Sequence, residues 1–218
     1  MVKKMAIFPA QSLPSQQVII LYMKLLGVFL LSLWMFQTAA GPQPDGKIFL
    51  LNPSFEDAPR ASACPLGWAS YTTGCTPDIM PGAWGIQVEP QDGKSCLALV
   101  TREDGTREDI SQQLPQDLKA GVCYTFRIYL AHAPQYVGYN HPVRLRIWGS
   151  AGRGKEQLLA SSNLVDHANW KEYKFQFVPN RNMRYITFEA FYAPGALFHY
   201  RGNIVLDNCS PIERCDRA

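Results

Sequence analysis

The sequence lacks the patterns that mark several large classes of protein. After residue 41, no segment carries apolar residues at helical spacing for more than about one turn, which excludes a helical bundle. No CxxC or HxxxH spacing occurs, which argues against a structural zinc site. The motif GxSxG, which carries the nucleophile of many serine hydrolases, is also absent.

The first forty residues contain an apolar run, but it is too short to cross a membrane. Leu25–Phe36 is 12 residues long, whereas a spanning helix needs roughly 20. Lysines are the only charged residues around it, and Gln37–Ala40 supplies small residues for cleavage. This arrangement predicts a secretory signal peptide at residues 1–40. Because Met23 and Lys24 would begin a more compact signal, translation from Met23 is an alternative start.

Neither sign of charge is in excess once the signal peptide is removed. The chain has 21 basic and 18 acidic residues, and residues 1–40 hold three lysines and no acid, so 18 of each remain. The mature protein therefore lacks the basic stripe that nucleic-acid binding requires. We expect it to be secreted, periplasmic or on the cell surface, and not to span a membrane.

All six cysteines lie after the predicted signal peptide, and an even number in that context indicates disulfides. Six cysteines allow 15 connectivities. Short loops favour two pairs, which are Cys64–Cys75 and Cys209–Cys215. The other two cysteines, Cys96 and Cys123, either pair with each other or stay free.

Alternation of apolar and polar residues dominates the mature chain. In Val122–Leu130 one face is apolar throughout, which is typical of a half-buried strand. Similar runs bring the number of predicted strands to about ten. They are Ile48–Leu51, Trp84–Glu89, Cys96–Thr101, Asp109–Leu114, Val143–Trp148, Gln157–Ser161, Tyr173–Val178, Tyr185–Tyr192 and Asn203–Asn208.

These strands predict an all-β protein, a two-sheet antiparallel β-sandwich of the jelly-roll type. A linker at residues 41–47 precedes the single domain at residues 48–212, and a C-terminal tail follows at residues 213–218. Two connections are long, Asp57–Ala83 and His132–Pro142. Since loops on a rigid sandwich commonly carry binding residues, we expect binding there.

Six short motifs occur in an order that resembles a known family. They are NPSFED at residues 52–57, Pro65–Trp68, Asp92–Ser95, Ile110–Leu114, Gly121–Phe126 and Asn203–Asn208. In this order they resemble the galactose-binding-like jelly roll of secreted carbohydrate-binding modules attached to xylanases and cellulases. The middle of the chain looks more like jelly-roll domains of bacterial cell-surface and gliding-motility-associated proteins. The resemblance spans Phe49 to Asn208 and implies the fold more strongly than it implies sugar binding.

The resemblance also implies a structural calcium ion and no organic cofactor. In that family the first and last strands are neighbours, and their acidic residues often hold Ca²⁺. Here Glu56 and Asp207 would be the side-chain ligands, and the carbonyls of Gly93 and Lys94 would complete a shell of oxygens. The alternative is that Glu56 simply pairs with Arg60 or with a backbone amide.

Aromatic and polar residues on loops and outer strand faces are the candidate ligand contacts. A flat ring offers an apolar surface to the face of a sugar, and neighbouring polar groups bind its hydroxyls. The candidates are Arg102, Arg127, Tyr129, His132, Tyr136, Tyr139, Arg144 and Arg146. Of these, we expect Arg127, Tyr129, Arg144 and Arg146 to line one groove and Tyr136 and Tyr139 to be exposed. The alternative is cross-strand pairing of exposed residues.

Together these features predict an exported, non-catalytic binding module whose partner is a glycan. The alternative is a structural, protein-binding jelly roll of a surface assembly without a sugar site. The third hypothesis is a hydrolase. A glycosidase would need two carboxylates about 5 to 9 Å apart, and the sequence contains acidic residues that could supply them. The acidic residues that could serve stand in no diagnostic motif; they are Asp78, Glu89, Glu103, Asp104, Glu108, Asp109 and Glu189.

Overall fold

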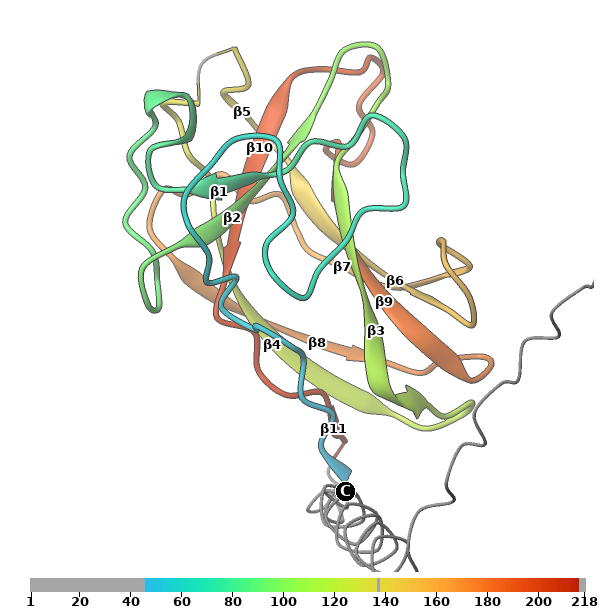
Figure 1. Cartoon of the computed structure of the whole chain (residues 1–218). Helices are drawn as coiled ribbons and strands as arrows, with labels where there is room; N and C mark the ends of the chain where they lie inside the picture. Colours follow the sequence, from blue (N-terminus) through green and yellow to red (C-terminus); the bar gives the residue numbers. More distant parts are fainter. Residues whose placement is uncertain (1–45, 137, 216–218) are drawn as a thin grey trace, which may run out of the picture. The chain divides into compact units, whose positions relative to one another are not determined.

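The computed structural model describes residues 46–136 and 138–215 (Figure 1). The predicted signal peptide, most of the predicted linker and the end of the predicted tail lie outside these residues. No α-helix occurs within the described residues, where the regular structure is β-strand with 3-10 turns such as η3 (Ala83–Gly85). Within the same ranges, no helix is long and apolar enough to cross a membrane.

The larger sheet has seven strands, and β4 (Tyr124–Ala131) is one of two members that pair with three others. β4 pairs with β8 (Lys171–Phe177), with β10 (Gly202–Asp207) and with the short β11 (Glu213–Arg214). The sheet continues from β10 through β2 and ends at β1. The remaining strands are β1 (Asp78–Met80), β2 (Cys96–Thr101) and β5 (His141–Pro142), which runs parallel to β10.

The smaller sheet has four antiparallel strands in the order β3-β9-β6-β7. They are β3 (Asp109–Leu118), β9 (Met183–Phe191), β6 (Arg144–Ser150) and β7 (Gln157–Ser161). The register of β9 places Glu189 opposite Asp109 on one side and Arg146 on the other. Polar side chains of three adjacent strands therefore meet on one face of this sheet.

The core lies between the two sheets and confirms the period-two pattern. Phe126 and Ile128 of β4 and Ile186 and Phe188 of β9 are fully buried in one cluster. Alternate residues on the same strands face outward, as strand geometry requires. The predicted two-sheet antiparallel β-sandwich is thus confirmed.

A second buried cluster lies on the opposite face of the seven-stranded sheet, at the end formed by β1, β2 and β10. There Ala98, Val100 and Val205 point away from the core and are covered by Ile86 and Tyr136 from two loops. Tyr136 belongs to one of the two long connections predicted to carry binding residues, 132–142, whereas Ile86 follows the other, 57–83, in the segment predicted as a strand. Because the two loops cover this face, they leave a site between them and the sheet edge.

Two predicted strands are wrong. Residues 48–51 form no strand, and only Ile48 bridges a partner, Ile212, so this segment does not lie beside β10. Leu206 of β10 instead pairs with strands β2 and β4. The segment predicted as strand Trp84–Glu89 contains part of η3, because Trp84 has φ 55°, a left-handed conformation that an extended strand does not allow.

Both predicted disulfides, Cys64–Cys75 and Cys209–Cys215, are also wrong. Cys215 is bonded to Cys123, 92 residues away, because β11 pairs with β4 and brings the two cysteines together. The other four cysteines are free thiols. The sulfur of Cys75 contacts the backbone N and O of Asp109 instead, each at 3.1 Å. Cys209 is buried in the core, and burial raises its pKa. β11 and Cys215 lie in the segment predicted as a tail.

Candidate functional site

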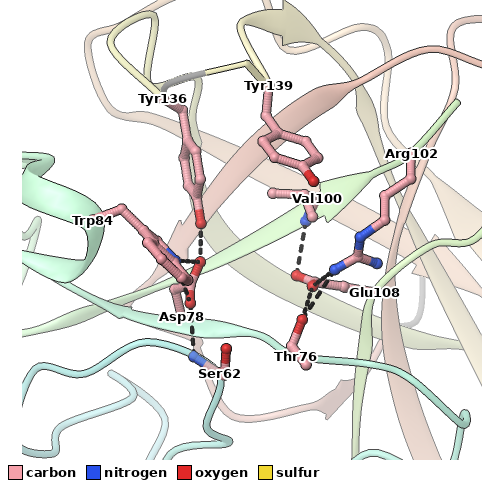
Figure 2. Close-up of a pocket in the computed structure, with 9 residues that line it drawn as sticks. All are labelled: Ser62, Thr76, Asp78, Trp84, Val100, Arg102, Glu108, Tyr136 and Tyr139. Carbon is pink, nitrogen blue, oxygen red and sulfur yellow. Dashed lines mark hydrogen bonds and ion pairs between the residues drawn. The ribbon is translucent and has the colours of Figure 1, made fainter.

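A pocket of about 420 Å³ opens on the covered face of the seven-stranded sheet (Figure 2). This volume falls in the range of small-molecule sites, roughly 300 to 1,000 Å³. The walls come from the 57–83 and 132–142 connections, from η3, from β2 and from the hairpin that joins β2 to β3. They consist of Ser62, Thr76, Asp78, Trp84, Val100, Arg102, Glu108, Tyr136 and Tyr139.

Asp78, the first residue of β1, organises one wall of the pocket. Its buried carboxylate accepts hydrogen bonds from the backbone N–H of Ser62 at 2.8 Å and from Nε1 of Trp84 at 3.2 Å. The hydroxyl of Tyr136 also donates to it. Burial, followed by the charge of Asp78, raises the pKa of Tyr136, so the phenol stays protonated and can donate. Asp78 therefore fixes the two aromatic rings relative to each other.

Glu108, which directly precedes β3, organises the opposite wall. Its carboxylate accepts hydrogen bonds from the Val100 N–H at 3.1 Å and the Thr76 hydroxyl at 2.9 Å, and it forms an ion pair with Arg102. Only 1% of Glu108 is exposed, and burial raises its pKa to about 7 although Arg102 opposes the shift. The ion pair holds the Arg102 guanidinium at the pocket wall.

Aromatic rings stand at the mouth of the pocket. Trp84 is 66% exposed although it is large and apolar, and its indole is held in place by Asp78. Its left-handed backbone conformation is flanked by Gly82 and Gly85, both of which also have positive φ. Tyr139 is half-buried and meets Tyr136 edge to face, with ring centroids 5.9 Å apart. An exposed ring that the protein holds in one orientation is a preformed contact surface.

The hydrogen-bond inventory indicates what the pocket can bind. A carboxylate has about four lone-pair sites, and Asp78 and Glu108 already use at least three each on protein donors. Their main role here is to position neighbours. The Thr76 hydroxyl is also engaged, because it donates to Glu108 and accepts from Arg102. The groups left to meet a ligand are the remaining N–H groups of Arg102 and the aromatic faces. This set suits a ligand with hydroxyl groups and an apolar face.

Three of the eight predicted ligand contacts, Arg102, Tyr136 and Tyr139, come together in the pocket. The expectation that Tyr136 is exposed is wrong, because it is 3% exposed and packs against Asp78. His132 lies at the end of β4 outside the pocket lining, and its buried backbone N–H bonds the carbonyl of His167.

The predicted groove of Arg127, Tyr129, Arg144 and Arg146 is wrong. The first two point outward from β4 in the seven-stranded sheet, and the last two point outward from β6 in the other sheet. The two outer faces of a sandwich are turned away from each other, so these four side chains cannot line one groove. The strands were predicted correctly, but their distribution between the sheets was not.

Sequence reasoning missed the residues that organise the pocket. Asp78 and Glu108 were candidates only as carboxylates without a motif, and Trp84 was placed on a strand. The available signal was Trp84 between two glycines in a long loop, a context that favours a turn with an exposed ring.

The two predicted calcium-binding carboxylates approach the same turn. Glu56 accepts hydrogen bonds from the N–H groups of Lys94 at 2.8 Å and Ser95 at 3.1 Å, and Asp207 accepts from those of Gln91 and Asp92. The alternative of backbone amides for Glu56 is therefore what the structure contains, and Arg60 pairs with Asp57 instead.

The donor chemistry of this turn fits a hard cation in part. Asp207 is fully buried, burial raises its pKa to about 7, and no basic side chain in the described ranges pairs with it or with Glu56. However, no three His, Cys, Asp or Glu side chains in the part of the chain that the structure describes are grouped to hold a metal. Carbonyls, such as those of Gly93 and Lys94, would have to supply the remaining ligands. Calcium stays a prediction.

Comparison with solved structures identifies the fold. The CBM22-1 xylan-binding domain of Paenibacillus barcinonensis Xyn10C matches 81% of this chain and 100% of its own, with a TM-score of 0.50 and 16% identity. The Stig cyclase Fisc from Fischerella sp. TAU matches 78% of this chain and 99% of its own, with a TM-score of 0.50 and 13% identity. The fold is a galactose-binding-like jelly roll. Neither a protein-family model nor a curated protein sequence matches the chain.

Sequence identities of 13% and 16% to these two proteins support a shared fold, but they do not assign a function to this chain. The jelly roll is shared by the carbohydrate-binding domain and the cyclase, so it supports different chemistries. The function of this jelly roll has to be argued from its own pocket.

Proposed function

We propose that the protein is a non-catalytic carbohydrate-binding domain that holds a sugar in the pocket between Trp84 and Arg102. The observation that carries this proposal is the exposed indole of Trp84, 66% accessible and fixed by Asp78 at the mouth of the pocket. A ring that the fold already holds in one orientation loses little side-chain entropy when it stacks on a ligand, which favours a binding role.

The pocket suits the two surfaces of a sugar ring. Trp84 and Tyr139 provide flat apolar faces against the C–H groups, while the remaining N–H groups of Arg102 can bind the hydroxyls. Glu108 holds Arg102 so that little side-chain entropy is lost when ligand binds. Because the pocket is compact, it suits one end of a glycan rather than the middle of a long chain.

An exported location agrees with this function. The predicted signal peptide and the Cys123–Cys215 disulfide support a secreted, periplasmic or cell-surface protein, since disulfides persist in oxidising compartments. The partner would be a glycan of the cell surface or the surroundings. The xylan-binding domain with the same fold supports the ligand class.

The test compares glycan binding by the parent protein, by Trp84→Ala and by a matched control. Phe198→Ala is that control, because Phe198 is an exposed aromatic (82%) outside the pocket lining. We expect hits on an array of neutral glycans, an affinity loss of at least about tenfold for Trp84→Ala, and none for Phe198→Ala, as measured by calorimetry. An array with no hits, or equal affinity for parent and Trp84→Ala, would refute the proposal.

A protein partner is the second candidate, and one observation favours it. Leu197 and Phe198 are adjacent in the loop between β9 and β10 and are 90% and 82% exposed. Exposed apolar residues that are neighbours can mark an interaction surface. If the glycan array is silent, this loop becomes the better candidate for function.

A further inference from the structure

The outer face of the four-stranded sheet carries three arginines around one phenyl ring. We call this group the Phe191 cluster: Arg107, Arg144, Arg146 and Phe191. The guanidinium carbons lie 4.9, 5.4 and 3.1 Å from the centroid of the Phe191 ring, in that order. Three like charges gathered on one ring repel each other unless an anion is nearby.

Two of the three arginines have no carboxylate partner among the described residues. Arg107 pairs with Glu189 at 3.2 Å. Arg144 donates only to a neutral acceptor, the carbonyl of Tyr192, at 3.0 Å. Arg146 forms neither a hydrogen bond nor an ion pair with the described residues, and its buried Nε has no partner. An orphaned buried N–H is uncommon and costs free energy comparable to a lost hydrogen bond.

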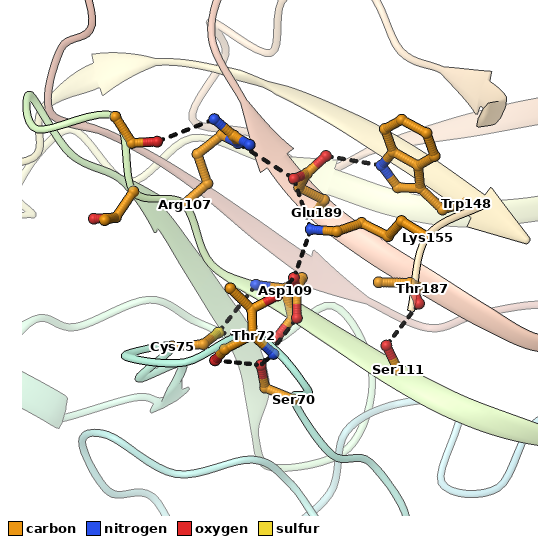
Figure 3. Close-up of polar contacts among 12 residues, drawn as sticks. Ser70, Thr72, Cys75, Arg107, Asp109, Ser111, Trp148, Lys155, Thr187 and Glu189 are labelled. Atoms are coloured by element: carbon orange, nitrogen blue, oxygen red, sulfur yellow. Dashed lines mark hydrogen bonds and ion pairs between the residues drawn. The ribbon is translucent and has the colours of Figure 1, made fainter. Parts of the chain in front are cut away.

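The nearby acids, Asp109 and Glu189, accept their hydrogen bonds from groups other than Arg144 and Arg146 (Figure 3). Lys155 bridges Asp109 and Glu189 at 2.8 and 2.9 Å, and Nε1 of Trp148 donates to Glu189 at 2.8 Å. Counting the Phe191 cluster with this network gives four cations and two anions. Residues 41–218 hold 18 basic and 18 acidic residues in total, so this excess of two cations is local.

The surroundings of Arg146 favour a bound anion. Burial lowers the pKa of Arg146, and the charges of Arg144 and Arg107 lower it further, while Glu189 opposes them. An anion placed between Arg144 and Arg146 would offset both the cost of burying the Arg146 charge and the repulsion between the arginines. The planar guanidinium group binds carboxylate and sulfate groups through two parallel hydrogen bonds.

We infer that Arg144 and Arg146 form a second binding site, which takes the carboxylate or sulfate ester of an acidic polysaccharide. The inference rests on the proposed function for the class of ligand, but the site is separate from the pocket. The ring of Trp148, whose centroid is 5.9 Å from the guanidinium carbon of Arg146, lies beside the arginines and offers apolar contact to a sugar ring. Two unpaired arginines suit single charged groups on a glycan, whereas nucleic-acid binding uses a longer basic stripe.

The experiment measures binding of the mature protein to polygalacturonate, dextran sulfate and neutral dextran by calorimetry at low salt. The test variant is Arg144→Gln with Arg146→Gln. The control is Arg127→Gln with Arg181→Gln, which removes the same charge from exposed arginines that pair with Glu172 and Glu156. We expect binding to at least one polyanion, no binding to dextran, and a loss of at least tenfold in the test variant against less than twofold in the control.

A conservative variant tests whether the planar guanidinium group, rather than charge alone, is needed for binding. Arg146→Lys keeps the charge but loses the planar fork, so it should also weaken binding at least threefold with an unchanged melting temperature. Absence of binding to both polyanions, equal losses in test and control variants, or equally tight binding to duplex DNA would overturn the inference.

The comparison of polygalacturonate with dextran sulfate separates recognition of a carboxylate from recognition of a sulfate ester. Trp84→Ala should leave polyanion binding unchanged, so failure of the pocket proposal and failure of this one are distinguishable.

Discussion

The Cys123–Cys215 disulfide gives the sharpest test of the fold, because its effect on stability can be worked out from its position. The perturbation is Cys215→Ser, with Cys123→Ser and the double variant beside it. The bond joins the start of β4 to the end of β11 and closes a loop across a sequence separation of 92 residues. Loss of the cross-link releases this loop in the unfolded state.

The size of the effect follows from the loop length. The chain-entropy relation gives about 4.6 kcal/mol at 25 °C for a loop of this length, within the range of about 2 to 5 kcal/mol for native disulfides. For a domain of this size, each kcal/mol shifts the melting temperature by roughly 2 to 4 °C, so we expect a decrease of about 10 to 18 °C. Reduction of the parent protein should lower the melting temperature by the same amount.

The assay is urea and thermal unfolding with and without reductant. All three serine variants should have the same stability and lose their sensitivity to reductant. Cys209→Ala should keep that sensitivity, because Cys209 is a free thiol, and denatured non-reduced parent protein should show the four thiols that the structure leaves free. If Cys215→Ser unfolds like the parent, or if Cys209→Ala removes the effect of reductant, the pairing described here is wrong.

Two further predictions concern buried carboxylates. If calcium binds the turn that Glu56 and Asp207 share, chelator lowers the melting temperature of the parent, and Asp207→Asn removes that dependence; an identical melting curve in chelator rejects calcium. The pKa of Glu108 is raised from 4.5 to about 7, so its protonated form favours folding, and that contribution is lost as pH rises from about 4.5 through 7. Glu108→Gln should therefore gain about 3 kcal/mol relative to the parent between pH 4 and pH 8 in denaturant titrations, and a constant difference contradicts the shift.

The alternation of apolar and polar residues predicted a strand correctly wherever the strand's own side chains determine its structure. Residues 96–101 and 157–161 form strands at the predicted bounds, and β4 differs by two residues or fewer at its ends. β1 was missed because it has three residues and lies between prolines in a long loop. Its strand character comes from pairing with β2, which no local pattern encodes.

The site was only partly predictable because its contacts are long-range. The two long loops and the residues Arg102, Tyr136 and Tyr139 were found from composition and position. The wall that Asp78 organises depends on a hydrogen bond to Tyr136, 58 residues away. The disulfide depends on β11, which a preference for short loops ignores. In each case tertiary pairing overrides a local signal.

The hairpin between β2 and β3 determines which variants can separate the two proposed sites. β2 belongs to the seven-stranded sheet and β3 to the four-stranded sheet, so residues 102–108 connect the two layers. Arg102 faces the pocket, and its carbonyl accepts a hydrogen bond of 2.7 Å from the Tyr192 hydroxyl, next to Phe191. Arg107 of the same hairpin belongs to the Phe191 cluster. The Tyr192 bond uses the backbone of Arg102 and survives substitution, but the Arg102 side chain pairs with Glu108, the residue after Arg107. An Arg102 variant can therefore alter the hairpin that both sites share, whereas the side-chain hydrogen bonds of Trp84 within the described residues go to Asp78 in the pocket, so Trp84 is the better reporter on the pocket.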